Sequence, residues 1–240
     1  MSTLTYIEFP PLSQANEDGL LAMGGQLSTS SLVSAYSQGI FPWYNAGQPI
    51  LWWSPDPRLV LYPAELKVSR SLAKVIRRGD FDIRINTDFD QVIQNCAWRG
   101  QSVEVGEAPD TWITQDMTRA YSQLFAEGYA HSVEVWRESN LIGGLYGLAL
   151  GKVFFGESMF STESNASKIA MWGLCQWLIQ QEFSIIDCQV TNDHLLSLGA
   201  REIPRDEFMH YLQEIEINQA STAFSTGSTK FFNDLKPVLI

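Results

Sequence analysis

An aspartate and a glutamine lie two residues apart in a short apolar segment of the C-terminal half of the chain. The segment FSIIDCQV (183–190) has the composition of a buried strand, and residues two apart along a strand share one face. Asp187 and Gln189 therefore point the same way, opposite to Ile186 and Cys188. A carboxylate and an amide in apolar surroundings destabilise the fold unless they have polar partners. The pattern indicates either a buried structural network or a polar site, and the residues alone leave both open.

A second segment with strand character carries a glutamate. In VFFGESMF (153–160), strict alternation places Glu157 on the face of Phe155 and Met159. If the two strands are neighbours, Glu157 converges with Asp187 and Gln189 near the strand ends. The plainer alternative is a glutamate in an ordinary turn at the end of a strand.

A basic segment stands out because the chain as a whole is acidic, with a net charge of −11. Such a charge disfavours bulk attraction to nucleic acid, so any RNA contact needs a local patch. Residues 67–78 contain no acidic side chain, and most of their basic residues repeat at steps of three and four, on one face of a helix expected over 70–78. This face either contacts phosphate groups or is an ordinary solvated surface. Its residues are Lys67, Arg70, Lys74, Arg77 and Arg78.

Eight tryptophans are available as flat surfaces for a ligand, or as core residues. Trp43 and Trp112 lie in a turn-rich segment and at the expected start of a helix. The three cysteines have no C-x-x-C spacing, the three histidines are scattered, and no glycine-rich phosphate loop is present. We therefore expect no metal site and no disulfide framework.

The expected elements define a mixed α/β sheet flanked by helices. The turn-rich residues 1–57 predict a small N-terminal domain that ends at SPDPR, and residues 58–240 predict a larger one. Strands are expected at 59–62, 132–138, 141–150, 153–160 and 183–190. Helices are expected at 28–38, 70–78, 112–127, 165–181, 192–200 and 204–215.

The chain shows no targeting or membrane signal. Its start, MSTLTYIEFPPL, lacks a basic segment followed by an apolar one, and no apolar run approaches the ~18 residues of a membrane span. We expect a cytoplasmic monomer with no membrane partner.

Several strings, taken together, resemble the bacterial leucyl/phenylalanyl-tRNA–protein transferase family. They run in order from about residue 9 to 215: GLLAMGGQLS, AYSQGIFPWY, ILWWSPDPR, TWIT, HSVEVW, GGLYG, GESMFS, NASK and IDCQVTNDHLLSLGA. The combination is far more specific than any single motif. Residues 218–240 match no motif of the family.

The resemblance implies a small N-terminal domain followed by a domain similar to N-acetyltransferases. It implies leucyl- or phenylalanyl-tRNA as the donor, with methionyl-tRNA open as a further donor. The acceptor would be a protein with N-terminal Arg or Lys, which the added residue marks for degradation. Because the donor is already an activated ester, we expect no cofactor.

The resemblance also assigns roles by matching position. Glu157, Asp187 and Gln189 would form the catalytic constellation, and Trp43 and Trp112 would contact the terminal adenosine of the tRNA. From the chemistry of such a transfer we then expect Asp187 to bond to the Gln189 amide NH₂ and Glu157 to supply negative charge for the cationic acceptor. The basic segment would contact the phosphates of the tRNA. The donor side chain would occupy an apolar pocket formed by Leu145, Phe154, Met159, Met171, Leu174, Leu178 and Ile186.

Two other functions share parts of this pattern. An acetyl-CoA-dependent N-acetyltransferase would have the same broad fold, but its phosphate loop is rich in glycine, and the corresponding STESNASK has none. A non-catalytic adaptor for basic protein N-termini would need an acidic pocket, but neither the basic helix nor the tryptophans.

Overall fold

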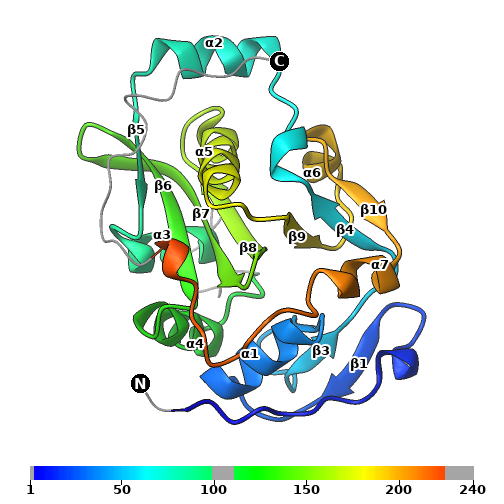
Figure 1. Ribbon diagram of the computed structural model, residues 1–240. Helices are drawn as coiled ribbons and strands as arrows, with labels where there is room; N and C mark the ends of the chain where they lie inside the picture. Colours follow the sequence, from blue (N-terminus) through cyan, green and yellow to red (C-terminus); the bar gives the residue numbers. More distant parts are fainter. Residues whose placement is uncertain (1–2, 99–110, 225–240) are drawn as a thin grey trace.

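The computed structural model describes residues 3–98 and 111–224, which form two β-sheets (Figure 1). The smaller sheet has the strand order β1-β3-β2, and the larger has the order β10-β4-β9-β8-β7-β6-β5. β8 and β9 are parallel, and the other neighbouring pairs are antiparallel. The strands are β1 (Leu20–Met23), β2 (Phe41–Pro42), β3 (Leu51–Trp53), β4 (Arg58–Leu61), β5 (Asp82–Ile85), β6 (Ala130–Arg137), β7 (Asn140–Leu150), β8 (Val153–Ser161), β9 (Ile185–Gln189) and β10 (Arg201–Ile203).

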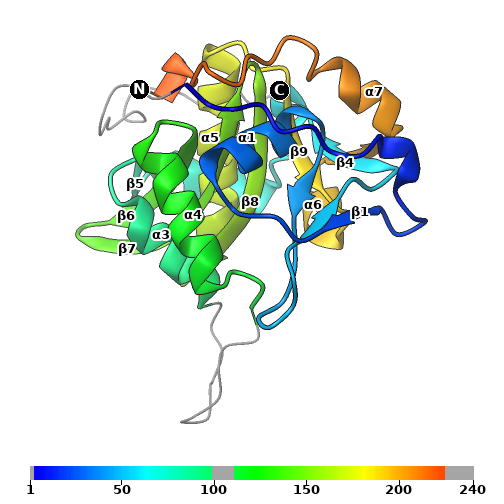
Figure 2. The ribbon, with the colours of Figure 1, turned by 90° about the horizontal axis from the view of Figure 1, so that it is seen from below.

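Helices cover both faces of the larger sheet (Figures 1 and 2). α5 packs on the face that also receives α2, while α1, α3 and α4 pack on the opposite face. The α-helices are α1 (Thr29–Ser37), α2 (Arg70–Arg78), α3 (Phe89–Ala97), α4 (Gln115–Ala126), α5 (Ala166–Gln180), α6 (Asp193–Ser197) and α7 (Arg205–His210). Short 3₁₀ turns are η1 (Leu12–Gln14), η2 (Pro63–Glu65) and η3 (Thr222–Phe224).

The expected mixed α/β class is confirmed, and every expected strand and helix is present. Some helices are shorter than predicted. α4 begins at Gln115, because the Thr114 hydroxyl accepts the backbone N–H of Met117 and so caps the helix there. α6 ends at Ser197, and α7 ends at His210, after which the chain continues in turns towards residue 215.

The sequence did not predict the smaller sheet, β5, β10 or α3. These strands are only two to four residues long, too short for alternation to show. α3 carried a recognisable signal, since Asp88 caps it by accepting the backbone N–H of Gln91.

The smaller sheet ends at Trp53 and the larger begins at Arg58, but one hydrophobic cluster spans both. Tyr36 from α1 packs edge-on against Phe155 of β8, for example. The domain division at residues 57 and 58 stays a prediction. In the described ranges no helix is long and apolar enough to cross a membrane.

Candidate active site

A cavity of about 1220 Å³ opens where β8 and β9 stop pairing. The last paired residues are Phe155 and Asp187. Both strands continue beyond that point, and Glu157 and Gln189 line the cavity. The gap between the two parallel strands therefore exposes polar side chains that full pairing would have enclosed.

A β-bulge at Glu157 turns the end of β8. β7 pairs Tyr146 with Ser158 and Gly147 with Gly156, which leaves Glu157 as the extra residue. Glu157 stays on the face of Phe155, as predicted. Met159 joins the opposite face with Leu145, so the expectation that Met159 shares the face of Glu157 is wrong. The bulge breaks the alternation on which that expectation depended.

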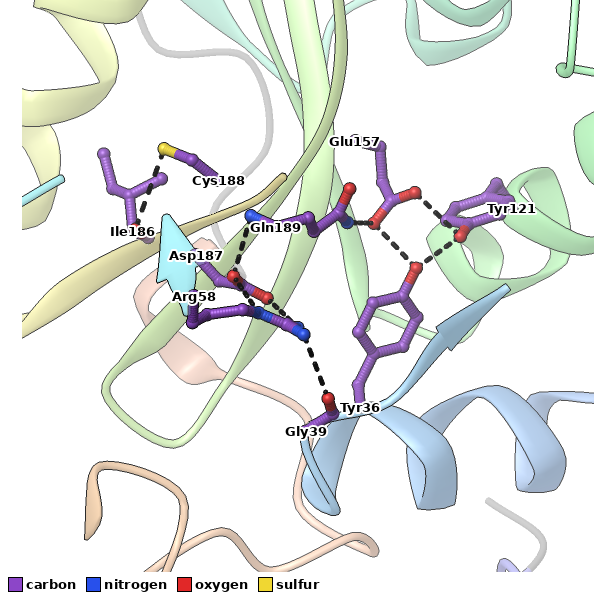
Figure 3. Close-up of polar contacts among 9 residues, drawn as sticks. All are labelled: Tyr36, Gly39, Arg58, Tyr121, Glu157, Ile186, Asp187, Cys188 and Gln189. Carbon is purple, nitrogen blue, oxygen red and sulfur yellow. Dashed lines mark hydrogen bonds and ion pairs between the residues drawn. The ribbon is translucent and has the colours of Figure 1, made fainter. Parts of the chain in front are cut away.

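Glu157 is the centre of a hydrogen-bonded cluster shown in Figure 3. Its Oε1 accepts from the Gln189 Nε2 at 2.9 Å and from the Tyr36 hydroxyl at 2.7 Å. Its Oε2 accepts from the Tyr121 hydroxyl at 2.9 Å, and the two tyrosine oxygens are 2.5 Å apart. α1, α4, β8 and β9 therefore meet at one carboxyl group.

Burial raises the pKa of Glu157 to about 7, and the nearby Asp187 adds to this rise. The hydrogen bonds from Tyr36, Tyr121 and Gln189 act in the opposite direction. Burial also raises the pKa of both tyrosines well above the usual value, so they remain donors near neutral pH. Glu157 is thus placed to hold the Gln189 amide, and its role as a partner for the acceptor's charge stays a prediction.

Asp187 is fully buried and forms a two-point ion pair with Arg58 of β4. The Arg58 Nε donates to Oδ1 at 2.8 Å, and Nη2 donates to Oδ2 at 2.7 Å. The remaining Arg58 nitrogen, Nη1, donates to the Gly39 carbonyl, and the guanidinium packs on the rings of Phe41 and Phe208. Asp187 is therefore part of a buried structural network, one of the two alternatives that its sequence context left open.

Asp187 binds the backbone of Gln189, not its side chain. Oδ1 of Asp187 accepts the Gln189 backbone N–H at 2.9 Å, whereas the side-chain NH₂ donates to Glu157. The predicted bond between Asp187 and the Gln189 amide NH₂ is therefore wrong. Alternation placed both side chains on one face, but it could not fix which polar group each would reach.

Gln189 has a left-handed backbone, with φ at 64°. The register of β4 also shifts here, since Leu59 faces Gln189 and Val60 faces Asp187. A non-glycine residue in this conformation is uncommon and strained, and such strain is often found at functional sites. The turn directs the Gln189 amide into the cavity. Within the described ranges, no group donates to its carbonyl oxygen, which is available to a ligand.

The predicted apolar pocket is largely assembled. The apolar wall of the cavity lies between the sheet and α5 and consists of Leu145, Phe154, Met159, Met171, Leu174 and Ile186. We call this wall the aminoacyl pocket, after the role that the resemblance predicts for it. Leu178 does not line the cavity. It lies one turn further along α5 and is fully buried in the core, so its expected contact with the donor is not supported.

Tryptophans surround another part of the cavity. Trp43 and Trp112 both line it, and Trp43 is 43% exposed and packs at a tilt against Trp53. Trp98, at the end of α3, also lines the cavity and is 65% exposed. Trp98 was not among the predicted site residues, although a large aromatic residue at a helix end is a signal for it.

The predicted basic residues lie on and before α2, the helix at the top of Figure 1, and none of them lines the cavity. The helix caps at Ser69 and Gly79 confirm its predicted span. All five basic side chains are exposed, and Arg78 pairs with Asp80 at 2.7 Å. This pairing reduces the positive charge that Arg78 offers to a ligand.

Three further polar residues of the site had no sequence signal of their own. Arg58, Tyr36 and Tyr121 are each fully buried and come from three separate elements. Only the packing of those elements brings them to Asp187 and Glu157. The described cysteines are free and buried, and in the described part of the chain no three metal-ligating side chains gather.

Comparison with known proteins assigns this chain to a family. The profile of the leucyl/phenylalanyl-tRNA protein transferase family matches residues 60–213, and the profile of that family's N-terminal domain matches residues 25–56. Relatives named leucyl/phenylalanyl-tRNA–protein transferase include one from Nitrosospira multiformis, 56% identical over 86% of this chain and 88% of its own. Another, from Azotobacter vinelandii, is 53% identical over 90% of this chain and 94% of its own.

Solved structures give much weaker similarities. A GCN5-related N-acetyltransferase from Kribbella flavida matches 70% of this chain and 58% of its own, with a TM-score of 0.36 and 10% identity. The sequence similarities are much stronger and show that the protein is a transferase enzyme. More specifically, the chain belongs to the leucyl/phenylalanyl-tRNA protein transferase family.

Proposed function

We propose that this enzyme moves Leu or Phe, and Met as a further donor residue, from aminoacyl-tRNA to the N-terminal Arg or Lys of acceptor proteins. The family's name supports the donor and the protein acceptor. The choice of Arg or Lys is supported by the net charge of −11, which favours cationic acceptors. The added residue would mark the acceptor for degradation.

The cavity offers separate surfaces for the two halves of the donor. An apolar side chain fits the aminoacyl pocket, while Trp43 and Trp112 supply aromatic faces on which the terminal adenine stacks. The ester bond between them then lies near Gln189. The exposed face of α2 is available for phosphate contacts further along the tRNA.

The reaction forms an amide bond from an ester. The acceptor α-amine attacks the ester carbonyl carbon, the new C–N bond forms, and the C–O bond to the ribose breaks. The proton lost by the amine ends on the ribose oxygen. Because an amide is more stable than an ester, this exchange is downhill and needs no other energy source.

Gln189 positions the amine and does not act as a base, since an amide has no useful proton affinity. Its free carbonyl oxygen accepts an N–H of the amine and aims the nitrogen lone pair at the ester. Glu157 holds the other end of the same amide, which fixes the direction of the carbonyl. Such positioning can remove several kcal/mol of the barrier, ~7 or more in favourable cases.

One observation carries this proposal: the Gln189 amide is clamped at its nitrogen and open at its oxygen, in a cavity with an apolar and an aromatic wall. The test incubates the protein with labelled Leu-tRNA and peptides beginning with Arg, Lys or Ala, without ATP. Transfer to the Arg and Lys peptides is expected. Binding of these peptides without transfer would favour a non-catalytic adaptor.

A direct binding measurement distinguishes the proposed function from that of an acetyl-CoA-dependent N-acetyltransferase. Calorimetry with CoA should show no saturable binding, whereas an aminoacyl-adenosine should bind in the same assay. Acetyl transfer from acetyl-CoA to the Arg peptide would contradict the proposal.

A further inference from the structure

We propose that Phe224, in the C-terminal segment, sets the depth of the aminoacyl pocket by supporting the Phe154 ring from behind. This inference rests on the proposed function, because it concerns which donor side chain the pocket accepts. Phe224 does not line the cavity itself. It is therefore a positioning residue that acts through Phe154.

Phe224 is inserted into an aromatic cluster on the α5 side of the sheet. It is only 3% exposed and stacks on His131, with ring centroids 4.2 Å apart and planes at 14°. Its centroid lies 6.0 Å from those of Phe154 and Phe183 and 6.2 Å from that of Trp177. Four rings thus hold one side chain from the end of the described chain.

A glycine lets the Phe154 ring extend towards this cluster. Gly147 of β7 pairs with His131 of β6, and a Cβ atom at Gly147 would lie 2.7 Å from Cε1 of Phe154. The ring of Phe154 therefore lies across the bare backbone of Gly147. Phe154 also lines the cavity, while Phe224 touches Phe154 and stacks on His131. The Phe154 ring separates the cavity from Phe224.

The cavity extends only part of the way along α5. It reaches Leu174 but not Leu178, which lies one helical turn further on. Between these two residues lies Trp177, which also contacts Phe224. Along α5, the cavity therefore stops short of the aromatic cluster around Phe224.

The segment that carries Phe224 is attached to the body of the protein. The Tyr129 hydroxyl donates to the Ile217 carbonyl at 3.0 Å, and the Asn86 side-chain NH₂ donates to the Phe224 carbonyl at 3.3 Å. The family profile ends at residue 213, so the resemblance assigned no role to this segment. Packed interiors transmit changes of volume, so a smaller side chain at position 224 leaves space into which the Phe154 ring can move.

The test measures kcat/KM for Phe-tRNA and Leu-tRNA with one Arg-initiated peptide, for wild type, Phe224→Leu and Phe224→Ala. A deeper pocket favours the longer Phe side chain. We expect the Phe-to-Leu ratio to rise about tenfold in Phe224→Ala, the effect of roughly one methylene in an apolar pocket. A smaller rise is expected in Phe224→Leu. The ratio is independent of the fraction of folded enzyme, because both donors are measured on the same preparation.

Phe125→Ala is the matched control. Phe125 stacks on Phe89 and lines no part of the cavity, so its loss weakens packing elsewhere and should leave the donor ratio unchanged. If wild type transfers neither residue, the proposed function fails. If wild type transfers both, and neither Phe224 variant changes the ratio more than the control does, the role of Phe224 is wrong.

Discussion

Arg58 and Asp187 form a fully buried ion pair that joins β4 to β9 by two hydrogen bonds of 2.8 and 2.7 Å. The same Asp187 accepts the backbone N–H of Gln189. Arg58 therefore supports the strained backbone of the residue that reaches the cavity. Asp187 contacts the residue that reaches the cavity but does not itself line the cavity.

Removing Arg58 should damage stability and activity together. Arg58→Met leaves the Asp187 carboxylate buried without its partner, and breaking such a pair costs about 3–5 kcal/mol. Urea unfolding measures this loss. The double variant Arg58→Met/Asp187→Leu should recover much of the stability, because no charge is left unpaired, but not the rate of transfer. A double variant as active as wild type would show that the pair does not position Gln189.

Replacing Gln189 should separate catalysis from folding. Gln189→Gly removes the amide but suits the left-handed backbone, so its free energy of unfolding should stay within about 1 kcal/mol of the wild-type value. Its kcat should fall roughly 10²–10³-fold, as for loss of one positioned hydrogen-bonding group. Gln189→Ala should lose the same activity and more stability. Near-normal turnover in either variant would contradict the proposed positioning of the amine.

Glu157 should give stability a specific pH dependence. Its pKa is about 7 in the folded protein, against an ordinary value of 4.5. The folded state therefore binds one more proton than the unfolded state between these values, and this contribution to stability is lost as the pH rises towards 7. Glu157→Gln cannot titrate. Denaturant unfolding between pH 4.5 and 7 should show wild type losing stability relative to the variant, whereas a constant difference would place the pKa near 4.5.

Neutralising the basic face of α2 should weaken tRNA binding in a way that depends on salt. For Arg70→Gln/Lys74→Gln/Arg77→Gln, the slope of log K against log salt should decrease by about 1 for each phosphate group that the variant no longer binds. The single variant Arg77→Gln should also decrease this slope, whereas its control Lys152→Gln, at the turn between β7 and β8, should not. Equal slopes for these two single variants would make α2 an ordinary solvated surface.

The tryptophans should act on donor binding through their aromatic faces. Trp43→Ala or Trp112→Ala should raise KM for aminoacyl-tRNA, since stacking of one base is worth about 1–3 kcal/mol. Trp43→Phe should restore much of this loss, because phenylalanine keeps an aromatic face. Equal KM values for the Ala and Phe variants would show that stacking is not how Trp43 binds the donor.

Local sequence patterns were sufficient to predict the helices and strands that are long enough to show several repeats of their periodicity. The helices α1, α2 and α5 appear where the sequence predicted them, with each end within one residue of the expected position. The face shared by Asp187 and Gln189 was also predictable, because alternation is a local property of a strand. Of the six described strands that are two to four residues long, only β4 was predicted, because so few residues carry little periodicity.

The sequence by itself determined the α/β class, the basic helix and six of the seven apolar residues expected around the donor side chain. Only the tertiary structure decided their partners: Arg58 for Asp187, and two tyrosines for Glu157. The bulge at Glu157 also moved Met159 to the face opposite to the one that strict alternation gives. Periodicity fixes which face a side chain occupies. The hydrogen bond that the side chain makes depends on groups brought from distant parts of the chain, and no local pattern encodes that.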